Sequence, residues 1–352
     1  MSQSFLFNIE SGYLEGLVRG FKNGLLKQSD YLNLTQCETL QDLLLNIQNT
    51  DYGHILTHEN EVPNVELIER RMRERIVVEY NYMRVNSSEP LSTFLDYIRY
   101  EHMIDNIALL MAGLSNRRPM RKLLPLCHPL GLFDQLEAIE VASNIDELFN
   151  SVLIDTPISK YASQHFDKMA LHNTDVEIQR SIIYKSYLED FYKFCKKLGG
   201  TTAEVMCNIL GFEADRRTIV IAVNSLSTDM QPKIRESLFP TCGKLGPVVR
   251  KLLASSTDFE QVRLTVSKFV TYAGVFNNIE RDTDNLITLD DRFLMLEAKM
   301  HVNSFLQQFH YGIFYSYLKL KELECRNIVW IAECISQRQN DKINAYIPIP
   351  IY

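Results

Sequence analysis

Charged side chains four residues apart occur three times in this 352-residue chain, each time just before an apolar run. On a helix such residues share one face, so an acid and a base at this spacing can form an ion pair. The three copies are Glu101/Asp105, Glu213/Arg217 and Glu322/Arg326, followed directly by Asn106, Thr218 and Asn327. The second and third copies predict ion pairs. The first copy is wholly acidic, so we expect a basic side chain from elsewhere, such as an arginine of a neighbouring repeat, beside Glu101 and Asp105.

The setting of these charges favours a structural role over acid–base catalysis. A solvent-exposed ion pair contributes only about 0.3–0.5 kcal/mol, whereas loss of one partner from a buried pair costs about 3–5 kcal/mol. The apolar residues that follow each copy, such as Ile328–Ala332 after Arg326, indicate that the pairs are half-buried. We therefore interpret them as devices that specify one arrangement of helices; three solvated helix faces are the alternative.

Other residues that could do chemistry lack a suitable context. His54 and His58 have a spacing that could hold zinc, but the surrounding sequence resembles a loop. Cys127 and His128 are adjacent and followed by proline, which is unsuitable for two ligands of one metal. The sequence has no phosphate-binding loop, dinucleotide motif or nucleophile elbow. We therefore predict no catalytic, cofactor or metal site, and no enzymatic activity of the chain by itself.

Composition limits the class of protein further. The chain has 37 basic and 44 acidic residues, a net charge of −7, which argues against nucleic acid as the main partner. The longest apolar run, Ile107–Leu114, is far shorter than the roughly 20 residues of a membrane-spanning helix. The N-terminus shows no signal-peptide pattern. We therefore expect a cytosolic protein with reduced cysteines.

The repeated charges belong to a longer internal repeat of about 110 residues. A second phrase repeats upstream of the charges (37–52, 142–157 and 255–270), and CHPLG at 127–131 matches CGKLG at 242–246. This period is too long for a solenoid unit and has the size of a small domain. The sequence predicts three similar helical modules at 13–115, 120–227 and 236–337, followed by an extended and docked C-terminal tail at 338–352.

Apolar residues at three-to-four spacing predict an all-α fold. A loop is expected at 277–290, and the glycines at 12, 16, 20 and 24 indicate either a helix with a bare stripe or short helical pieces broken by turns. The predicted helices are Ile68–Met83, Leu91–Leu114, Val176–Leu198, Glu204–Leu226, Asp290–Leu306 and Phe309–Arg338.

Several longer phrases, in this order, resemble a known family. GYLEGLVRG, YLNLTQCETLQDL, NTDYG, CHPLG, YLEDFYKFC, LGGTTAE, FEADRR and RNIVWIAECI are similar to subunit d of V-type proton-translocating ATPases and to its counterpart, the C subunit of the archaeal and bacterial rotary ATPases. The resemblance covers essentially the whole chain. It implies an all-helical, funnel-shaped protein with three similar modules about a pseudo-threefold axis.

The resemblance also implies a role and partners. Such a protein is a non-catalytic part of the rotor that joins the central stalk to the proteolipid ring. The implied partners are the proteolipid c-ring, stalk subunits D and F, and the cytosolic domain of the a subunit, with no nucleic acid and with the membrane reached only through the complex. The implied location is the cytosolic face of vacuolar, lysosomal, endosomal or other acidic-organelle membranes. A free-standing helical adaptor that binds partners in a central cavity is the competing class.

One disulfide candidate follows from the arrangement that the resemblance implies. Three modules closed into a ring would bring the last helix beside the first module, and Cys334 towards Cys37. A reducing cytosol favours free thiols at both positions.

Overall fold

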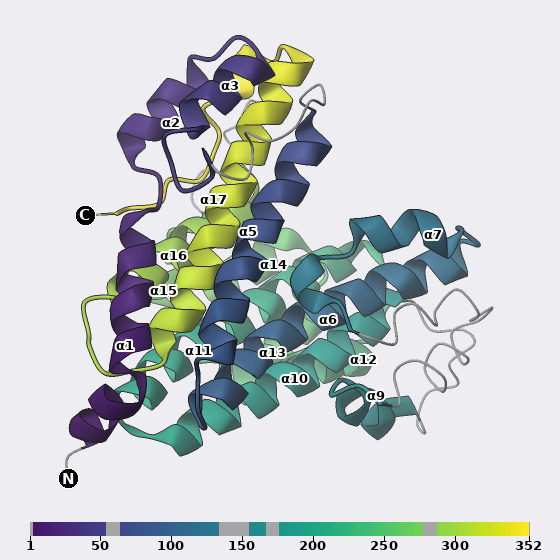
Figure 1. Ribbon diagram of the computed structural model, residues 1–352. Helices are drawn as coiled ribbons and strands as arrows, with labels where there is room; N and C mark the ends of the chain where they lie inside the picture. The colour runs from purple at the N-terminus through teal and green to yellow at the C-terminus, as the bar shows by residue number, and fades with distance from the viewer. Residues whose placement is uncertain (1–2, 54–63, 134–154, 167–175, 277–286, 352) are drawn as a thin grey trace. The chain divides into compact units, whose positions relative to one another are not determined.

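The computed structural model describes residues 3–53, 64–133, 155–166, 176–276 and 287–351, and every regular element in these ranges is a helix (Figure 1). The all-α prediction is therefore confirmed. The helices are α1 (Gln3–Asn23), α2 (Gln28–Thr35), α3 (Leu40–Ile47), α5 (Val65–Val85), α6 (Leu91–Ser115), α7 (Met120–Leu123), α9 (Ser159–Phe166), α10 (Val176–Leu198), α11 (Gly200–Asn224), α12 (Pro232–Leu238), α13 (Pro247–Ser255), α14 (Phe259–Val266), α15 (Val270–Ala273), α16 (Leu289–Ser304) and α17 (Gly312–Gln337).

The six helices expected from apolar periodicity are present, and their ends agree to within a few residues. The glycine-rich N-terminal stretch is one continuous helix, α1, so the alternative of short broken pieces is wrong. A Cβ added at Gly16 or Gly20 would touch nothing within 4 Å, so no second helix among the described residues approaches this part of the stripe. The expected loop at 277–290 lies largely outside the described residues.

The chain divides into two compact units. The first comprises Met1–Ser92, Gly199–Val205 and Val266–Tyr352, and α17 is its central helix. α1, α3, α5 and α16 pack around α17, which is why its apolar residues are buried on several faces (Figure 1). Such an all-round apolar helix is expected only in the centre of a helical assembly.

The second unit comprises Thr93–Leu198 and Met206–Thr265, and it holds most of α6 and α11 together with α7, α9, α10, α12 and α13. α10 packs on α9 and α12, and α12 packs on α13. An aromatic cluster joins α6 to α10, where the ring of Tyr97 stacks on Phe191 with centroids 4.9 Å apart. Such pairs add about 0.5–1.5 kcal/mol to the burial of their area.

The C-terminal tail packs against its own unit as the prolines of the sequence indicate. After α17 and a short 3-10 turn (Asn340–Lys342), residues 346–351 run without helix. Ile343, Ile347 and Ile349 are nevertheless buried. The division of the chain into three modules and a separate tail at 338–352 stays a prediction.

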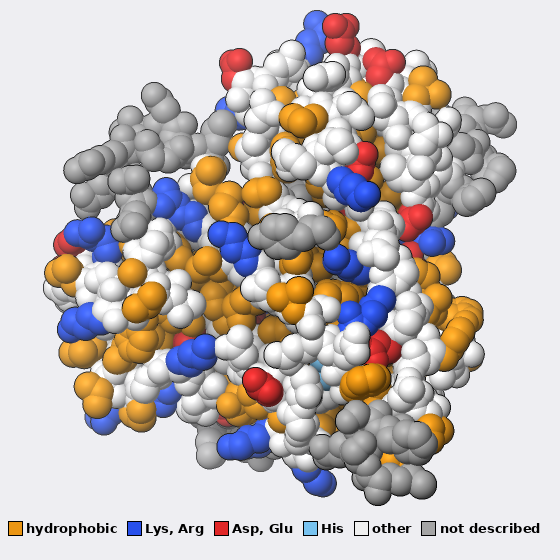
Figure 2. Space-filling model, turned by 90° about the vertical axis from the view of Figure 1, so that its left-hand side faces the viewer, with side chains coloured by type: hydrophobic (Ala, Val, Ile, Leu, Met, Phe, Trp, Pro, Cys, Tyr) orange, Lys and Arg blue, Asp and Glu red, His pale blue; other side chains and the backbone are white. Residues whose placement is uncertain are grey.

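The surface mixes apolar and charged groups. Apolar side chains and Lys or Arg side chains lie next to one another over the face drawn in Figure 2. Among the described helices, none combines the length and the apolar character that crossing a membrane requires.

The repeated charge motif has the same place in each predicted module. It lies on α6, α11 and α17, which are the last long helices of the three segments, and each follows another long helix (α5, α10 and α16). α6 and α17 also end alike, because Arg117 and Arg338 both adopt the left-handed conformation 16 residues after Glu101 and Glu322. The superposition of the three modules and the funnel about a pseudo-threefold axis stay predictions.

Candidate functional site

The first two copies of the motif meet in one buried cluster of the second unit. Glu213 accepts hydrogen bonds from Arg216 (2.7 Å) and from Arg217 (2.7 Å), both on its own helix α11. The hydroxyl of Tyr184, on α10, donates to Glu101 (2.9 Å) and lies 3.4 Å from Glu213. The predicted Glu213–Arg217 contact is therefore present. Tyr184 links it to Glu101 of the first copy.

Electrostatics keep Glu213 ionised. Burial raises the pKa of Glu213, but the charges and hydrogen bonds of Arg216 and Arg217 outweigh burial and lower this pKa to about 2. The side chain of Glu213 is only 5% exposed, so its charge depends on these two arginines rather than on water. Such a site stabilises a fixed anion and does not suit proton transfer near neutral pH.

The acidic first copy finds a basic partner on another helix. Arg180, on α10, donates to Asp105 through Nε (3.1 Å) and Nη2 (2.7 Å). Arg180 belongs to the second predicted module and Asp105 to the first, which is the arrangement that the two neighbouring acids require. Both side chains remain about one-third exposed, so the pair is worth roughly 1 kcal/mol or less.

The third copy uses partners other than the expected ones. Arg326 donates to Asp291 on α16 (2.7 Å), and Glu322 lies 3.5 Å from Lys319. The side chain of Arg326 is half-exposed, because it reaches out of α17 towards α16 instead of along its own helix. The sequence motif therefore recurs on α17, but its glutamate and arginine bind other residues there and not each other, as they do on α11.

A fully buried ion pair lies on another face of the same turns of α17. Lys321 Nζ lies 3.0 Å from Glu324 Oε1, and both side chains are 0% exposed. The backbone N–H of Leu26 and the hydroxyl of Tyr52 (2.7 Å) also donate to Glu324. Burial lowers the pKa of Lys321, but the carboxylates of Glu324 and Glu79 outweigh burial and raise it. This cluster ties α17 to the segment after α1 and to the segment after α3.

Asparagine side chains on two of the motif helices also form hydrogen bonds with the backbone of segments that follow these helices in the sequence. Asn106 on α6 accepts from the N–H of His128 (2.7 Å) and donates to its carbonyl (3.0 Å). Asn327 on α17 makes the same pair of bonds with Ile347 (3.0 and 2.6 Å). On α11 the aligned Thr218 bonds only its own helix, at Ala214.

On α11 an aspartate, Asp215, bonds the backbone of a later segment in place of an asparagine. Asp215 accepts from the backbone N–H groups of Lys244 and Leu245, each at 3.0 Å. The loops held in this way are CHPLG and CGKLG, and each contains a glycine at a close approach. A Cβ on Gly131 would lie 2.5 Å from the backbone of His102, and a Cβ on Gly243 would lie 2.0 Å from Asp215. Gly246, which aligns with Gly131, would touch nothing within 4 Å, so the feature that the two loops share is that side chains of α6 and α11 bond their backbone.

The two hydrogen bonds between Asn327 and the Ile347 backbone, here called the tail clamp, give a testable expectation. Asn327→Ala removes both bonds to Ile347 and leaves a buried N–H and carbonyl unpaired, at about 1–3 kcal/mol for each. We expect the tail to detach before the rest of the first unit unfolds. Hydrogen exchange of residues 343–351 should then be faster, with α5 and α17 unchanged. Asn340→Ala, in the exposed turn ahead of the tail, is the control; equal protection in both variants would contradict the role of the clamp.

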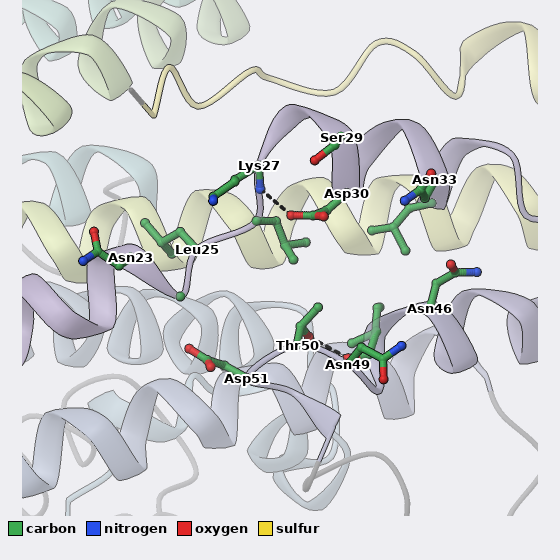
Figure 3. Close-up of a pocket in the computed structure, with 14 residues that line it drawn as sticks. Asn23, Leu25, Lys27, Ser29, Asp30, Asn33, Asn46, Asn49, Thr50 and Asp51 are labelled. Carbon is green, nitrogen blue, oxygen red and sulfur yellow. Dashed lines mark hydrogen bonds between the residues drawn. The ribbon is translucent and has the colours of Figure 1, made fainter.

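A polar cavity of about 640 Å³ lies in the first unit between the end of α1, α2 and α3. Figure 3 shows Asn33 on α2 and Asn46 on α3 on its opposite walls, with Asp51 at one end. The hydroxyl of Thr50 is held by the Ile47 carbonyl (2.6 Å) and the Lys27 N–H by Asp30 (2.7 Å). Such amide and carboxylate groups suit polar ligands better than apolar ones.

The remaining sequence candidates have structural positions. Cys37 and Cys334 are free thiols. His128 accepts from the N–H of Leu130 (3.2 Å) and so starts a 3-10 turn. His54 and His58 lie outside the described residues. Within the described residues no group of three His, Cys, Asp or Glu side chains could hold a metal ion.

Sequence reasoning missed Lys321, Glu324 and Tyr184. The i,i+3 spacing of Lys321 and Glu324 was visible, but the three charged residues of KELE resemble a solvated helix face. Their burial follows from the packing of α1, α3 and α5 around α17. Tyr184 carried no local signal, because its role depends on helices that are distant in sequence.

The fold and these contacts define a class of protein: an all-α assembly whose charged residues bind one another and the chain's own backbone. Comparison with known proteins agrees. The chain matches the family model described as ATP synthase (C/AC39) subunit over residues 14–346. It therefore belongs to the C/AC39 family of ATP synthase subunits.

Several relatives match over most or nearly all of their length. The probable V-type proton ATPase subunit d 2 of Drosophila melanogaster is 57% identical over 348 residues, which is 99% of each chain. The V-type proton ATPase subunit d of Saccharomyces cerevisiae is 43% identical over 97% of this chain and 98% of its own length. The C subunit of the A-type ATP synthase of Pyrococcus horikoshii is 22% identical over 70% of this chain and 64% of its own length.

Proposed function

We propose that this chain is the non-catalytic rotor subunit of a V-type proton ATPase, where it couples the central stalk to the proteolipid ring during ATP-driven proton transport. The observation that carries the proposal is the identity of 57% over 99% of both chains with a protein named as subunit d of such an enzyme. The family match over residues 14–346 supports the same assignment.

The partners proposed for this role are the proteolipid c-ring, the stalk subunits D and F, and the cytosolic domain of the a subunit. The proposed place is the cytosolic face of an acidic-organelle membrane, such as that of a vacuole, lysosome or endosome. The absence of a membrane-spanning helix among the described residues is compatible with attachment through the complex.

The contacts within each unit suit a part that passes torque. Buried carboxylates in each unit bond to groups on other elements: Glu324 of α17 accepts from the Tyr52 hydroxyl and the Leu26 N–H, and Glu101 of α6 accepts from Tyr184 of α10. Shear between these elements would leave buried polar groups unpaired, at a cost of about 1–3 kcal/mol for each. The clamps at Asn106 and Asn327 fix further segments of chain to the same helices.

Purification of the native complex tests the assignment. A tagged copy of the chain, isolated from detergent-solubilised membranes, should bring down proteolipid and stalk subunits in a mass spectrum. Isolation with other cytosolic proteins and without these subunits would instead favour the free-standing adaptor.

Arg217→Ala is expected to lower proton pumping per ATP hydrolysed, or the yield of assembled complex, several-fold, with little loss of helicity. The reason is that Glu213, 5% exposed, would keep only Arg216 as a positively charged partner among the described residues. Pumping and hydrolysis are measured together in vesicles that carry the variant. Arg326→Ala is the matched control, because its half-exposed bond to Asp291 is worth about 1 kcal/mol or less. Normal assembly and pumping with Arg217→Ala would refute a mechanical role for the cluster.

A further inference from the structure

The polar cavity of the first unit offers exposed amide groups to a ligand. Its volume of about 640 Å³ lies in the range of ligand pockets in proteins. Asn33 on α2 and Asn46 on α3 lie on its opposite walls, and both residues are exposed (Figure 3). The buried side chains of Leu34 and Ile47 also line it. The cavity therefore combines hydrogen-bonding groups with some apolar surface.

The amide of Asn46 is held in one orientation. Its NH2 group donates to the Asp42 carbonyl (2.9 Å) and to the sulfur of Cys37 (3.3 Å). Its carbonyl oxygen has no donor among the described residues and can accept an N–H from a ligand. The amide of Asn33, on the facing wall, offers both an acceptor and two donors. The two walls together can therefore bond a ligand that carries N–H and C=O groups.

Asparagine side chains already bind non-helical backbone elsewhere in this chain. Asn106 accepts from the N–H of His128 and donates to its carbonyl. Asn327 makes the same pair of bonds with Ile347. Neither His128 nor Ile347 lies in a helix. The asparagines of the cavity can hold a further extended segment in the same way.

The cavity lies in an acidic part of the chain. Residues 24–53 carry four acidic side chains and a single basic one, Lys27. Asp51 lies at one end of the cavity, against Gly24, where a Cβ would come within 2.1 Å of the Asp51 carboxylate (Figure 3). Gly24 does not have a positive φ, so room for Asp51 is a better reason for its missing side chain than backbone conformation. The charge of this region favours a cationic ligand.

Other classes of ligand fit less well. None of the 14 residues that line the cavity is aromatic, so a nucleobase would find no ring to stack on. One lysine against two aspartates disfavours a phosphate group. In the part of the chain that the structure describes, no three His, Cys, Asp or Glu side chains could hold a metal ion. A polyamine would suit the charge, but it has no C=O group to accept from Asn33.

We infer that this cavity binds an extended, basic segment of a partner protein. Asn33 and Asn46 bond the backbone of that segment, and Asp51 pairs with one of its lysine or arginine side chains. In such complexes the main-chain hydrogen bonds supply affinity, and contacts to individual side chains supply specificity. The inference goes beyond the proposed rotor role and does not depend on it.

Titration of the full-length chain with a short basic peptide tests this inference. The probe is acetyl-tetralysine amide, and binding is followed by NMR through the side-chain amide signals of Asn33 and Asn46. These signals should shift and reach saturation. Acetyl-tetraglutamate amide should leave them unchanged, because Asp51 would repel it. Higher salt should weaken binding of the lysine peptide.

Two variants act on the cavity in different ways. Asp51→Asn combined with Asn33→Ala removes an ion pair and two backbone bonds, so the lysine peptide should bind about thirtyfold more weakly, as measured on the Asn46 signal. Ser29→Trp places a large side chain in the cavity without changing its charge, and it should abolish saturable binding. None of the three side chains is buried, so both variants should keep the helical circular dichroism of the unmodified chain. Unchanged binding by Ser29→Trp would place the peptide elsewhere and overturn the site.

A matched variant removes an acid and an amide outside the cavity. Glu38 and Gln41 are exposed near the start of α3 and do not line the cavity. Glu38→Gln combined with Gln41→Ala should therefore leave binding of the lysine peptide nearly unchanged. An equal loss in the two double variants would reduce the effect to net charge and overturn a specific site.

Two further results would also overturn the inference. If the asparagine signals saturate equally with spermine, the cavity takes a polycation without contacting a peptide backbone. If they do not saturate with the lysine peptide, the cavity holds no basic peptide. Because the assay uses the isolated chain, neither result bears on its assembly with proteolipid and stalk subunits.

Discussion

Lys321→Met is expected to destabilise the first unit by about 3–5 kcal/mol, since it leaves the Glu324 carboxylate charged and fully buried with only the Tyr52 hydroxyl and the Leu26 N–H as donors. Trp330 is the sole tryptophan of the chain and lies on α17, so its fluorescence during urea unfolding reports on this unit. The midpoint of unfolding should fall with little change in the slope m.

Two further variants isolate the cause. Adding Glu324→Gln to Lys321→Met removes the stranded charge and keeps an acceptor for Tyr52, so the double variant should be more stable than the single one. Arg73→Met removes a cation from a partly exposed pair with Glu69 on α5, and it should cost about 1 kcal/mol or less. A loss for Lys321→Met no larger than that for Arg73→Met would show that burial adds nothing to the pair.

Glu213→Gln should make the free energy of unfolding of the second unit less dependent on pH in the acidic range. The pKa of Glu213 is about 2 in the folded chain and about 4.5 when unfolded, since its two arginines outweigh burial. A carboxyl with a lowered pKa stabilises the fold fully above pH 4.5, and this contribution disappears as the pH falls towards 2. The shift corresponds to about 3 kcal/mol.

The measurement is urea unfolding, followed by circular dichroism, at a series of pH values between 2 and 7. The unmodified chain should be about 3 kcal/mol more stable than the variant at pH 7, and this difference should vanish near pH 2. Glu260→Gln is the control, because Glu260 pairs with Arg263 at a similar spacing on the surface. A difference that does not change with pH would contradict the ionised state assigned to Glu213.

Local features of the sequence were sufficient for the six long helices that apolar spacing predicted. Apolar spacing located α10 to the residue, and α3 begins at a local cap, where Thr39 accepts from the N–H of Asp42 (3.1 Å). The prolines near the C-terminus likewise predicted a non-helical tail. These predictions depend on contacts within a few residues, which the sequence displays directly.

The partners of the charges were only partly predictable. Glu213 and Arg217 form their expected pair, because an i,i+4 contact needs nothing beyond the helix that carries it. Asp105 required some base, but its identity as Arg180 depends on α10 lying beside α6. Arg326 could reach either its own helix or a neighbour, and the packing of α16 beside α17 gives it Asp291.

The sequence by itself determined that this chain is all-α, that one motif recurs on three long helices, and which family it resembles. Only the tertiary structure decided which charges are buried and what they bind. Lys321 and Glu324 look like surface residues in KELE and are fully enclosed, whereas the half-exposed Arg326 stands close by on the same helix. The physical reason is that helical periodicity fixes which residues share a face, while burial and cross-helix partners depend on the helices that pack against that face.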